Sequence, residues 1–111
     1  LQLRPFSQTA LEGLATCAFG SQDWEAASRF CAKLVEFTPD HFERWFNVGV
    51  AHQKCGRLDQ ARHAYQEAVR IRPDAKQAHV NLGIVEQEMG NLKAARESYE
   101  RALKIAPDLA D

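Results

Sequence analysis

The sequence is poor in the residue types and patterns on which most enzymes and membrane proteins depend. Its 111 residues include only three cysteines, four histidines and one methionine. The net charge is -1, so we expect no bulk attraction to nucleic acid or to an acidic membrane. No apolar run approaches the ~20 residues that span a bilayer, and no signal-peptide pattern is found. We therefore expect neither a nucleic-acid partner nor a membrane partner.

The cysteines are too irregularly spaced for a disulfide framework or a zinc site. Cys17, Cys31 and Cys55 are odd in number and form no CxxC pair. Each lies among apolar neighbours in a predicted helix, so we expect three buried thiols that act as small hydrophobic side chains. A chain without disulfides favours a reducing compartment, and we expect a cytoplasmic localisation on that ground.

Motifs for catalysis are missing as well. The sequence contains no glycine-rich phosphate loop, no HExxH motif and no nucleophile elbow. The histidines are spread along the chain and form no ligand pair on one helical face: His41, His52, His63 and His79. We predict no enzymatic activity, no cofactor and no metal site for this segment.

Proline is scarce, but its four occurrences are regular. Pro5, Pro39, Pro73 and Pro107 follow one another at intervals of 34 residues. The same interval separates columns of small and of bulky residues: Ala15, Gly49 and Gly83; Ala27, Ala61 and Ala95; Cys31, Tyr65 and Tyr99. An internal repeat with this period organises the chain.

Alignment on the prolines divides the chain into units. Three of them are complete: 8–39, 42–73 and 76–107. We expect residues 1–7 to be the tail of a preceding repeat or an N-terminal turn, and residues 108–111 to be a truncated C-terminal segment. Each complete unit has two stretches of helical periodicity, which predicts about six helices.

Glycine and aspartate mark the expected helix ends. Gly56 and Gly90 fall where the first helix of a unit should stop, because glycine adopts the left-handed conformation at low cost. Asp40, Asp74 and Asp108 follow the prolines, and we predict them to be N-caps or first-turn residues of the next helix. The small columns predict points at which two paired helices cross closely, with the bulky residues filling the space beside them.

The repeated residues resemble the signature of the tetratricopeptide repeat (TPR) family, which is a large residue, Leu-Gly, an aromatic, and later Ala, an aromatic, Ala and Pro. Unit two matches it with Trp45, Val48, Gly49, His52, Ala61, Tyr65, Ala68 and Pro73. Unit three matches it with His79, Leu82, Gly83, Glu86, Ala95, Tyr99, Ala102 and Pro107. Unit one matches least, with Leu11, Leu14, Ala15, Ala18, Ala27, Cys31, Leu34 and Pro39. The resemblance implies an all-α, right-handed superhelical TPR solenoid of three helix-turn-helix repeats.

The resemblance also implies where a partner binds, because the first helices of such repeats line a concave groove. The predicted partner-binding residues are Glu12, Thr16, Phe19, Glu43, Phe46, Asn47, Val50, Lys54, Gln77, Val80, Asn81, Ile84 and Glu88. Four of them form an apolar ribbon of the type that marks an interaction site: Phe46, Val50, Val80 and Ile84. The alternative is that another part of the same protein covers this ribbon.

Asn47 and Asn81 lie one repeat apart in the predicted groove. An amide donates and accepts hydrogen bonds, so stacked asparagines can hold the backbone of an extended peptide without reading its sequence. Some TPR proteins carry such an asparagine ladder, and these two positions match it. The alternative is that each asparagine bonds a neighbouring helix.

Chaperone-binding TPR domains grip an acidic C-terminal peptide with a carboxylate clamp of Lys and Arg. The positions of this chain that match the clamp are Glu12, Thr16, Asn47, Gln77 and Asn81. Of these residues, only Asn47 agrees with the clamp. We therefore expect no carboxylate-clamp binding. The charges of the groove favour a neutral or basic partner: Glu12, Glu43 and Glu88 against Lys54.

Taken together, these features predict a non-catalytic scaffold or adaptor that binds a peptide or helix of a partner protein in the concave groove. The ligand is expected to be apolar with neutral or basic character. Two alternatives stay open. One is self-association into an oligomer, through the repeat ends or through the groove. The other is a substrate-presenting TPR arm of a larger enzyme.

Overall fold

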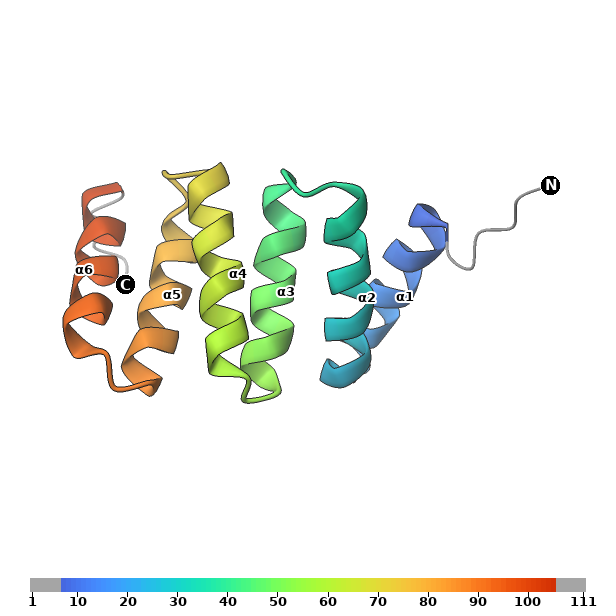
Figure 1. Ribbon diagram of the computed structural model, residues 1–111, viewed down its shortest axis with the longest axis horizontal. Helices are drawn as coiled ribbons and strands as arrows, with labels where there is room; N and C mark the ends of the chain where they lie inside the picture. Colours follow the sequence, from blue (N-terminus) through green and yellow to red (C-terminus); the bar gives the residue numbers. More distant parts are fainter. Residues whose placement is uncertain (1–6, 106–111) are drawn as a thin grey trace.

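The computed structural model describes residues 7–105, and these form six α-helices joined by short turns. The helices are α1 (Gln8–Gly20), α2 (Trp24–Phe37), α3 (Phe42–Lys54), α4 (Leu58–Ile71), α5 (Lys76–Glu88) and α6 (Leu92–Ile105). They lie side by side in chain order (Figure 1). The expected N-terminal tail, apart from Ser7, and the expected C-terminal segment lie outside the described residues.

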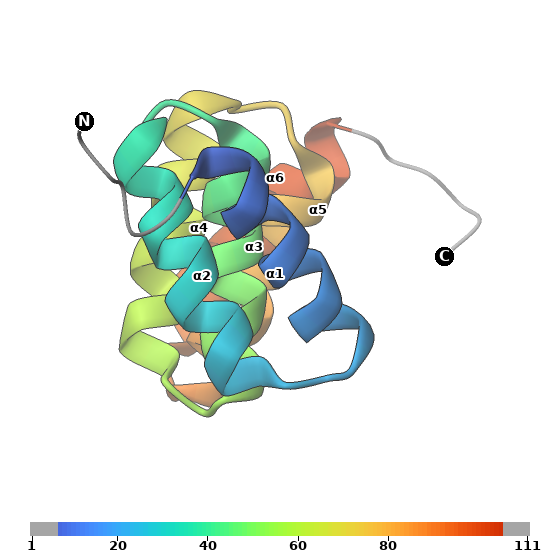
Figure 2. The same ribbon diagram turned by 90° about the vertical axis from the view of Figure 1, so that its right-hand side faces the viewer.

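Each predicted unit holds one helical hairpin, and successive hairpins stack on one another. The hairpins are α1 with α2, α3 with α4, and α5 with α6, and the stack is continued by packing of α2 on α3 and of α4 on α5. Figure 2 views the stack end-on, with α1 and α2 nearest to the viewer. The predicted all-α fold is thus confirmed.

Glycine and tyrosine make the close contacts within the second and third hairpins. A Cβ atom added to Gly49 would lie 2.6 Å from Cε1 of Tyr65, and one added to Gly83 would lie 2.7 Å from Cε1 of Tyr99. Tyr65 is fully buried. The predicted pairing of small and bulky columns is therefore confirmed at these positions, because each ring occupies the space that a larger residue would need.

The turn within each hairpin places one residue in the left-handed region. Gly56 and Gly90 have φ angles of +78° and +85°, as the sequence predicted for glycines at a helix end. Gln22 occupies the corresponding place in the first hairpin with a φ of 60°. A residue with a side chain is strained in this conformation, so the first turn carries backbone strain that the glycines of the other two turns avoid.

The N-cap prediction for Asp40 and Asp74 is wrong. His41 and Ala75 occupy the N-cap positions of α3 and α5, and neither makes a side-chain capping bond. Each aspartate therefore lies one residue before the cap. The carboxylate of Asp40 lies instead 3.8 Å from the guanidinium of Arg70 in α4.

Ring nitrogens tie the second and third hairpins to the turns that precede them. Nε1 of Trp45 donates to the carbonyl oxygen of Pro39 at 2.6 Å. Nε2 of His79 lies 2.8 Å from the carbonyl oxygen of Pro73; a carbonyl can only accept, so this nitrogen is the donor. His79 is buried and takes the structural place of the tryptophan one repeat earlier.

Only one of the three thiols is buried, so that prediction is wrong for the other two. Cys31 is 2% exposed, and burial raises the pKa of its thiol to about 11. Cys17 is exposed and Cys55 is half-buried. The buried stripe of α1 consists of Leu11, Ala15 and Ala18. Cys17 lies outside this stripe and is exposed.

Candidate functional site

The odd-numbered and even-numbered helices form opposite sides of the stack. A hollow opens between α1 and α3, with residues of α2 as its floor. Another hollow opens between α2 and α4, with residues of α3 as its floor. We call the exposed side of α1, α3 and α5 the odd-helix face. All of the predicted partner-binding residues belong to these three helices.

None of the predicted partner-binding residues is buried in the core. Seven are exposed: Glu12, Thr16, Glu43, Asn47, Lys54, Gln77 and Glu88. Six are half-buried: Phe19, Phe46, Val50, Val80, Asn81 and Ile84. All of them are therefore open to a partner to some degree, although several also make contacts within the chain.

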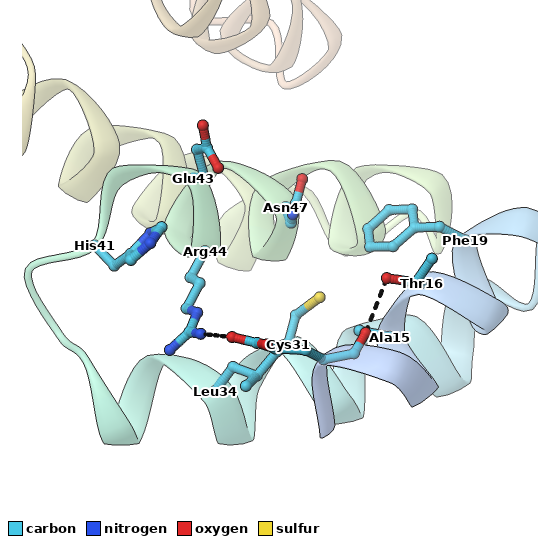
Figure 3. Close-up of a pocket in the computed structure, with 10 residues that line it drawn as sticks. Ala15, Thr16, Phe19, Cys31, Leu34, His41, Glu43, Arg44 and Asn47 are labelled. Carbon is cyan, nitrogen blue, oxygen red and sulfur yellow. Dashed lines mark hydrogen bonds and ion pairs between the residues drawn. The ribbon is translucent and has the colours of Figure 1, made fainter. Parts of the chain in front are cut away.

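The hollow between α1 and α3 brings five predicted residues together. Its volume is about 230 Å³, and the predicted residues around it are Glu12, Thr16, Phe19, Glu43 and Asn47. Five further lining residues were not among the predicted partner-binding residues: Ala15, Cys31, Leu34, His41 and Arg44. Figure 3 shows the sulfur of Cys31 pointing into this space, with Phe19 at one end and Arg44 at the other.

Arg44 organises the polar end of the hollow. It is 9% exposed, and its guanidinium donates to Oγ1 of Thr38 at 2.6 Å and forms an ion pair with the carboxylate of Glu12. Glu12, which the sequence analysis counted among the acidic groups of the groove, is therefore paired with a cation. One signal in the sequence pointed to Arg44, because the residues one repeat before and after it are Ala10 and Ala78.

The apolar ribbon belongs partly to the core. The ring of Phe46 makes an edge contact with Tyr65 at 5.7 Å between centroids and stacks on Phe42 at 5.8 Å. Phe46 and Val50 also pack on the buried cluster that contains Tyr65 and Leu82. Each side chain thus divides its surface between the interior and the odd-helix face.

A chain of side-chain hydrogen bonds crosses the odd-helix face between α5 and α3. Nε2 of Gln77 donates to Oδ1 of Asn81 at 2.8 Å, and Nδ2 of Asn81 donates to the hydroxyl of Tyr65 at 3.4 Å. That hydroxyl donates to Oε1 of Gln53 at 2.9 Å. Burial raises the pKa of Tyr65 to about 12, partly offset by the bond from Asn81.

The two asparagines of the predicted ladder therefore differ. Asn81 is held by Gln77 and Tyr65, as the alternative interpretation expected. The side chain of Asn47 makes no hydrogen bond to any residue in the range 7–105 and is exposed. Asn47 is thus the amide of this pair that is ready to bind a ligand.

The remaining charges on the odd-helix face are mainly acidic. Glu43 and Glu88 are exposed and form no ion pair within the described part of the chain. The ammonium group of Lys54 lies over the ring of Trp24 at 5.6 Å from its centroid. The lysine is therefore placed toward Trp24, the first residue of α2.

A second polar cluster joins α2 to α3. Nη2 of Arg57 pairs with Oε2 of Glu25 at 2.5 Å, and Nη1 donates to Oγ of Ser28 at 3.2 Å and to Nδ1 of His52 at 3.3 Å. The pKa of His52 is lowered, first by burial and second by the positive charge of Arg57, with Glu25 acting in the opposite direction. A proton on His52 therefore works against this junction.

Residues 7–105 contain neither a candidate metal site nor a candidate membrane-spanning helix. No group of three or more His, Cys, Asp or Glu side chains is placed to hold a metal ion. No helix in this range has the length and apolar character needed to cross a membrane.

Stacked helical hairpins with an exposed, partly apolar face define a helical-repeat interaction module. The chain belongs to the tetratricopeptide repeat family, since a model of that family matches residues 42–108. TPR arrays in general bind other proteins, and membership of this family supports a protein-interaction module. No curated protein sequence matches it.

Solved structures show the same fold. MamA from MSR-1 superposes with a TM-score of 0.86 at 23% identity, over 91% of this chain and 58% of MamA. The Arabidopsis OM64 TPR domain gives a TM-score of 0.83 at 17% identity, over 90% of this chain and 83% of that domain. O-GlcNAc transferase of Thermobaculum terrenum gives 0.79 at 30% identity, over 92% of this chain and 20% of the transferase. The chain thus spans about 58% of the length of MamA.

Proposed function

We propose that the odd-helix face binds a peptide or helix of a partner protein that is apolar with neutral or basic character. The observation that carries this proposal is the combination on one face of half-exposed apolar side chains and an unengaged amide. Phe46, Val80 and Ile84 supply apolar surface, and Asn47 offers a donor and an acceptor. An exposed patch of this kind is typical of protein interaction sites.

Charge supports a neutral or basic partner. Glu43 and Glu88 are exposed without a paired cation in the described range, whereas the one arginine at the hollow is already paired with Glu12. A C-terminal carboxylate would meet these glutamates instead of the lysines and arginines of a carboxylate clamp. The proposed ligand therefore differs from the acidic tails that chaperone-binding TPR domains recognise.

A peptide-display selection tests the proposal without a known partner. The chain is panned against a random peptide library, and the selected peptides are measured against variants by fluorescence anisotropy. Ile84→Glu and Asn47→Ala change only the odd-helix face, and each should weaken binding by about tenfold. Leu92→Glu and Leu103→Glu are matched controls because these leucines are 66% and 58% exposed on α6.

The control leucines also separate docking from self-association. If the selected peptides bind Ile84→Glu as tightly as the unchanged chain, the odd-helix face is not the binding site. Sedimentation over a range of concentrations should show a monomer. A dimer that is lost in the Leu92→Glu and Leu103→Glu variants would instead assign function to the exposed leucines of α6, as the self-association alternative holds.

One comparison favours a second candidate function, an interaction arm of a larger enzyme. The segment shared with Thermobaculum terrenum O-GlcNAc transferase covers 92% of this chain at 30% identity but only 20% of the transferase. In that case the odd-helix face would present substrate proteins to an appended catalytic domain. Sequencing of the complete gene tests this candidate, since it requires an enzyme domain in the same reading frame.

A further inference from the structure

The hollow between α1 and α3 exists at the place where the first hairpin departs from the repeat pattern. In the second and third hairpins the rings of Tyr65 and Tyr99 fill the space against Gly49 and Gly83. The first hairpin has Cys31 at the tyrosine position. The side chain of Cys31 ends at the sulfur, so the space that a tyrosine ring fills in the other hairpins stays empty here and forms part of the hollow.

The neighbouring positions have changed with it. Ala15 stands where the other hairpins have glycine, and Phe19 stands where they have Gln53 and Gln87, whose side chains accept hydrogen bonds from the tyrosine hydroxyls. The first hairpin has therefore lost the ring, the glycine that makes room for it and the amide that anchors it. The hollow is open toward the odd-helix face, where Thr16 and Asn47 lie on its rim.

The size of the hollow suits one side chain. A cavity of about 150 Å³ is enough to bind benzene, and this hollow measures about 230 Å³. Small-molecule sites generally begin at about 300 Å³. The space is thus large enough for an aromatic ring and too small for a typical free cofactor or metabolite.

The lining favours a ring over an aliphatic or a cationic side chain. The floor is apolar, with Ala15, Cys31 and Leu34 all buried. A sulfur atom, an aromatic edge and a guanidinium each attract an aromatic ring, and the hollow offers all three in Cys31, Phe19 and Arg44. The buried part of the lining offers a lysine or arginine no unpaired carboxylate, because Glu12 is paired with Arg44 and Glu43 is exposed at the rim.

We propose that this hollow is a specificity pocket that takes one aromatic side chain from the protein segment bound to the odd-helix face. This inference rests on the proposed function and adds to it a residue class and a position. The partner's ring enters between Thr16 and Asn47 and occupies, from the outside, the space that tyrosine fills from the inside in the other hairpins. Glu43 at the rim then suits a basic residue next to the aromatic one.

The chain itself offers the variant that closes the pocket. Ala15→Gly with Cys31→Tyr gives the first hairpin the pair that the second and third hairpins already accommodate. Thr16→Phe is a second closing variant, because Thr16 is exposed at the rim and a change there leaves the core intact. Cys17→Tyr adds the same ring to an exposed position of α1 and is the matched control.

The experiment uses amino-acid amides as probes and NMR spectra of the isotope-labelled chain. N-acetyl-phenylalanine amide is compared with the leucine and lysine equivalents. The phenylalanine probe should shift the backbone amide signals of Thr16, Phe19 and Asn47 in a saturable way, and more tightly than the other two probes. Binding should weaken by about tenfold or more in both closing variants, because the ring loses its buried surface, and should persist in Cys17→Tyr.

Three results would overturn the pocket: no saturable shift with the phenylalanine probe, equal binding by both closing variants, or tighter binding of the lysine probe. The outcome is separate from that of the proposed function. Probe binding that vanishes in the closing variants supports the pocket even if Ile84→Glu leaves the selected peptides bound. Peptide binding that depends on Ile84 but survives both closing variants supports the face and rejects the pocket.

Discussion

The contact between Gly49 and Tyr65 makes a quantitative prediction about stability. Replacement of glycine by alanine inside a helix normally stabilises it by about 1 kcal/mol. At Gly49 the added Cβ would lie 2.6 Å from Cε1 of Tyr65. The ring cannot swing away, because it is fully buried and its hydroxyl is bonded to Gln53 and Asn81. Overpacking of this kind costs about 1–3 kcal/mol, and each strained hydrogen bond about 1 kcal/mol.

With both hydrogen bonds of Tyr65 strained, the net effect of Gly49→Ala is therefore a loss of about 2–4 kcal/mol in the free energy of unfolding. Gly13→Ala is the matched control, since Gly13 also lies within a helix but a Cβ there meets nothing within 4 Å. It should stabilise the chain by about 1 kcal/mol. Gly83→Ala should fall between the two, because the Tyr99 ring beside it is only half-buried and yields more easily.

Thermal and urea unfolding followed by circular dichroism measure these differences. A change of 1 kcal/mol corresponds to a shift of about 4 °C in Tm for a chain of this size. The double variant Gly49→Ala with Tyr65→Cys copies the pair of the first hairpin, so its loss should be smaller than the sum of the two single losses. A Gly49→Ala variant as stable as Gly13→Ala would refute the argument that the tyrosine ring fixes the distance between the paired helices.

Two further predictions concern the charged contacts. Glu12→Gln should destabilise the chain by about 1 kcal/mol, because it removes the carboxylate that pairs with buried Arg44 and leaves a half-exposed amide in its place. Glu43→Gln is the control: the carboxylate of Glu43 has no ion-pair partner in the described range, so this variant should leave the urea midpoint unchanged. Stability should fall as the pH drops below about 6.5, since the lowered pKa of His52 means that the unfolded chain binds the proton more tightly than the folded chain does. His52→Gln should flatten this dependence in urea titrations at pH 5 to 8, and an unchanged slope would place its origin elsewhere.

The repeat period allowed the architecture to be predicted, because each repeat imposes the same local geometry. The helix ends at Gly56 and Gly90 and the contact of Gly49 with Tyr65 depend only on residue size and backbone freedom at fixed positions. The exposure of Cys17 was mispredicted because apolar neighbours in sequence do not reveal which side of a helix faces its partners. In α1 that side carries Leu11, Ala15 and Ala18, and Cys17 lies outside it.

The candidate site was predicted less completely than the fold, because its details depend on pairs of residues from different repeats. The placing of Glu12, Thr16 and Asn47 on one face follows from the period alone. The pairing of Glu12 with Arg44 does not, since it joins residues 32 positions apart. The same holds for Asn81, which reaches the hydroxyl of Tyr65 in the preceding hairpin. Alignment of the units compares equivalent positions, so it does not reveal contacts between non-equivalent residues of different repeats.

The hydrogen-bond chain from Gln77 to Gln53 runs in one direction only. Gln77 and Asn81 both belong to α5, and each side chain donates to the next one toward Gln53. Within residues 7–105 this leaves the carbonyl oxygen of Gln77 and the amide protons of Gln53 without a partner. The surface therefore has a polarity along the stack. A peptide that runs from the first hairpin to the third meets the amide protons of Gln53 before the carbonyl oxygen of Gln77, and a peptide that runs the other way meets them in the reverse order. The two orientations of a bound backbone therefore differ in energy even without contacts from the peptide's side chains.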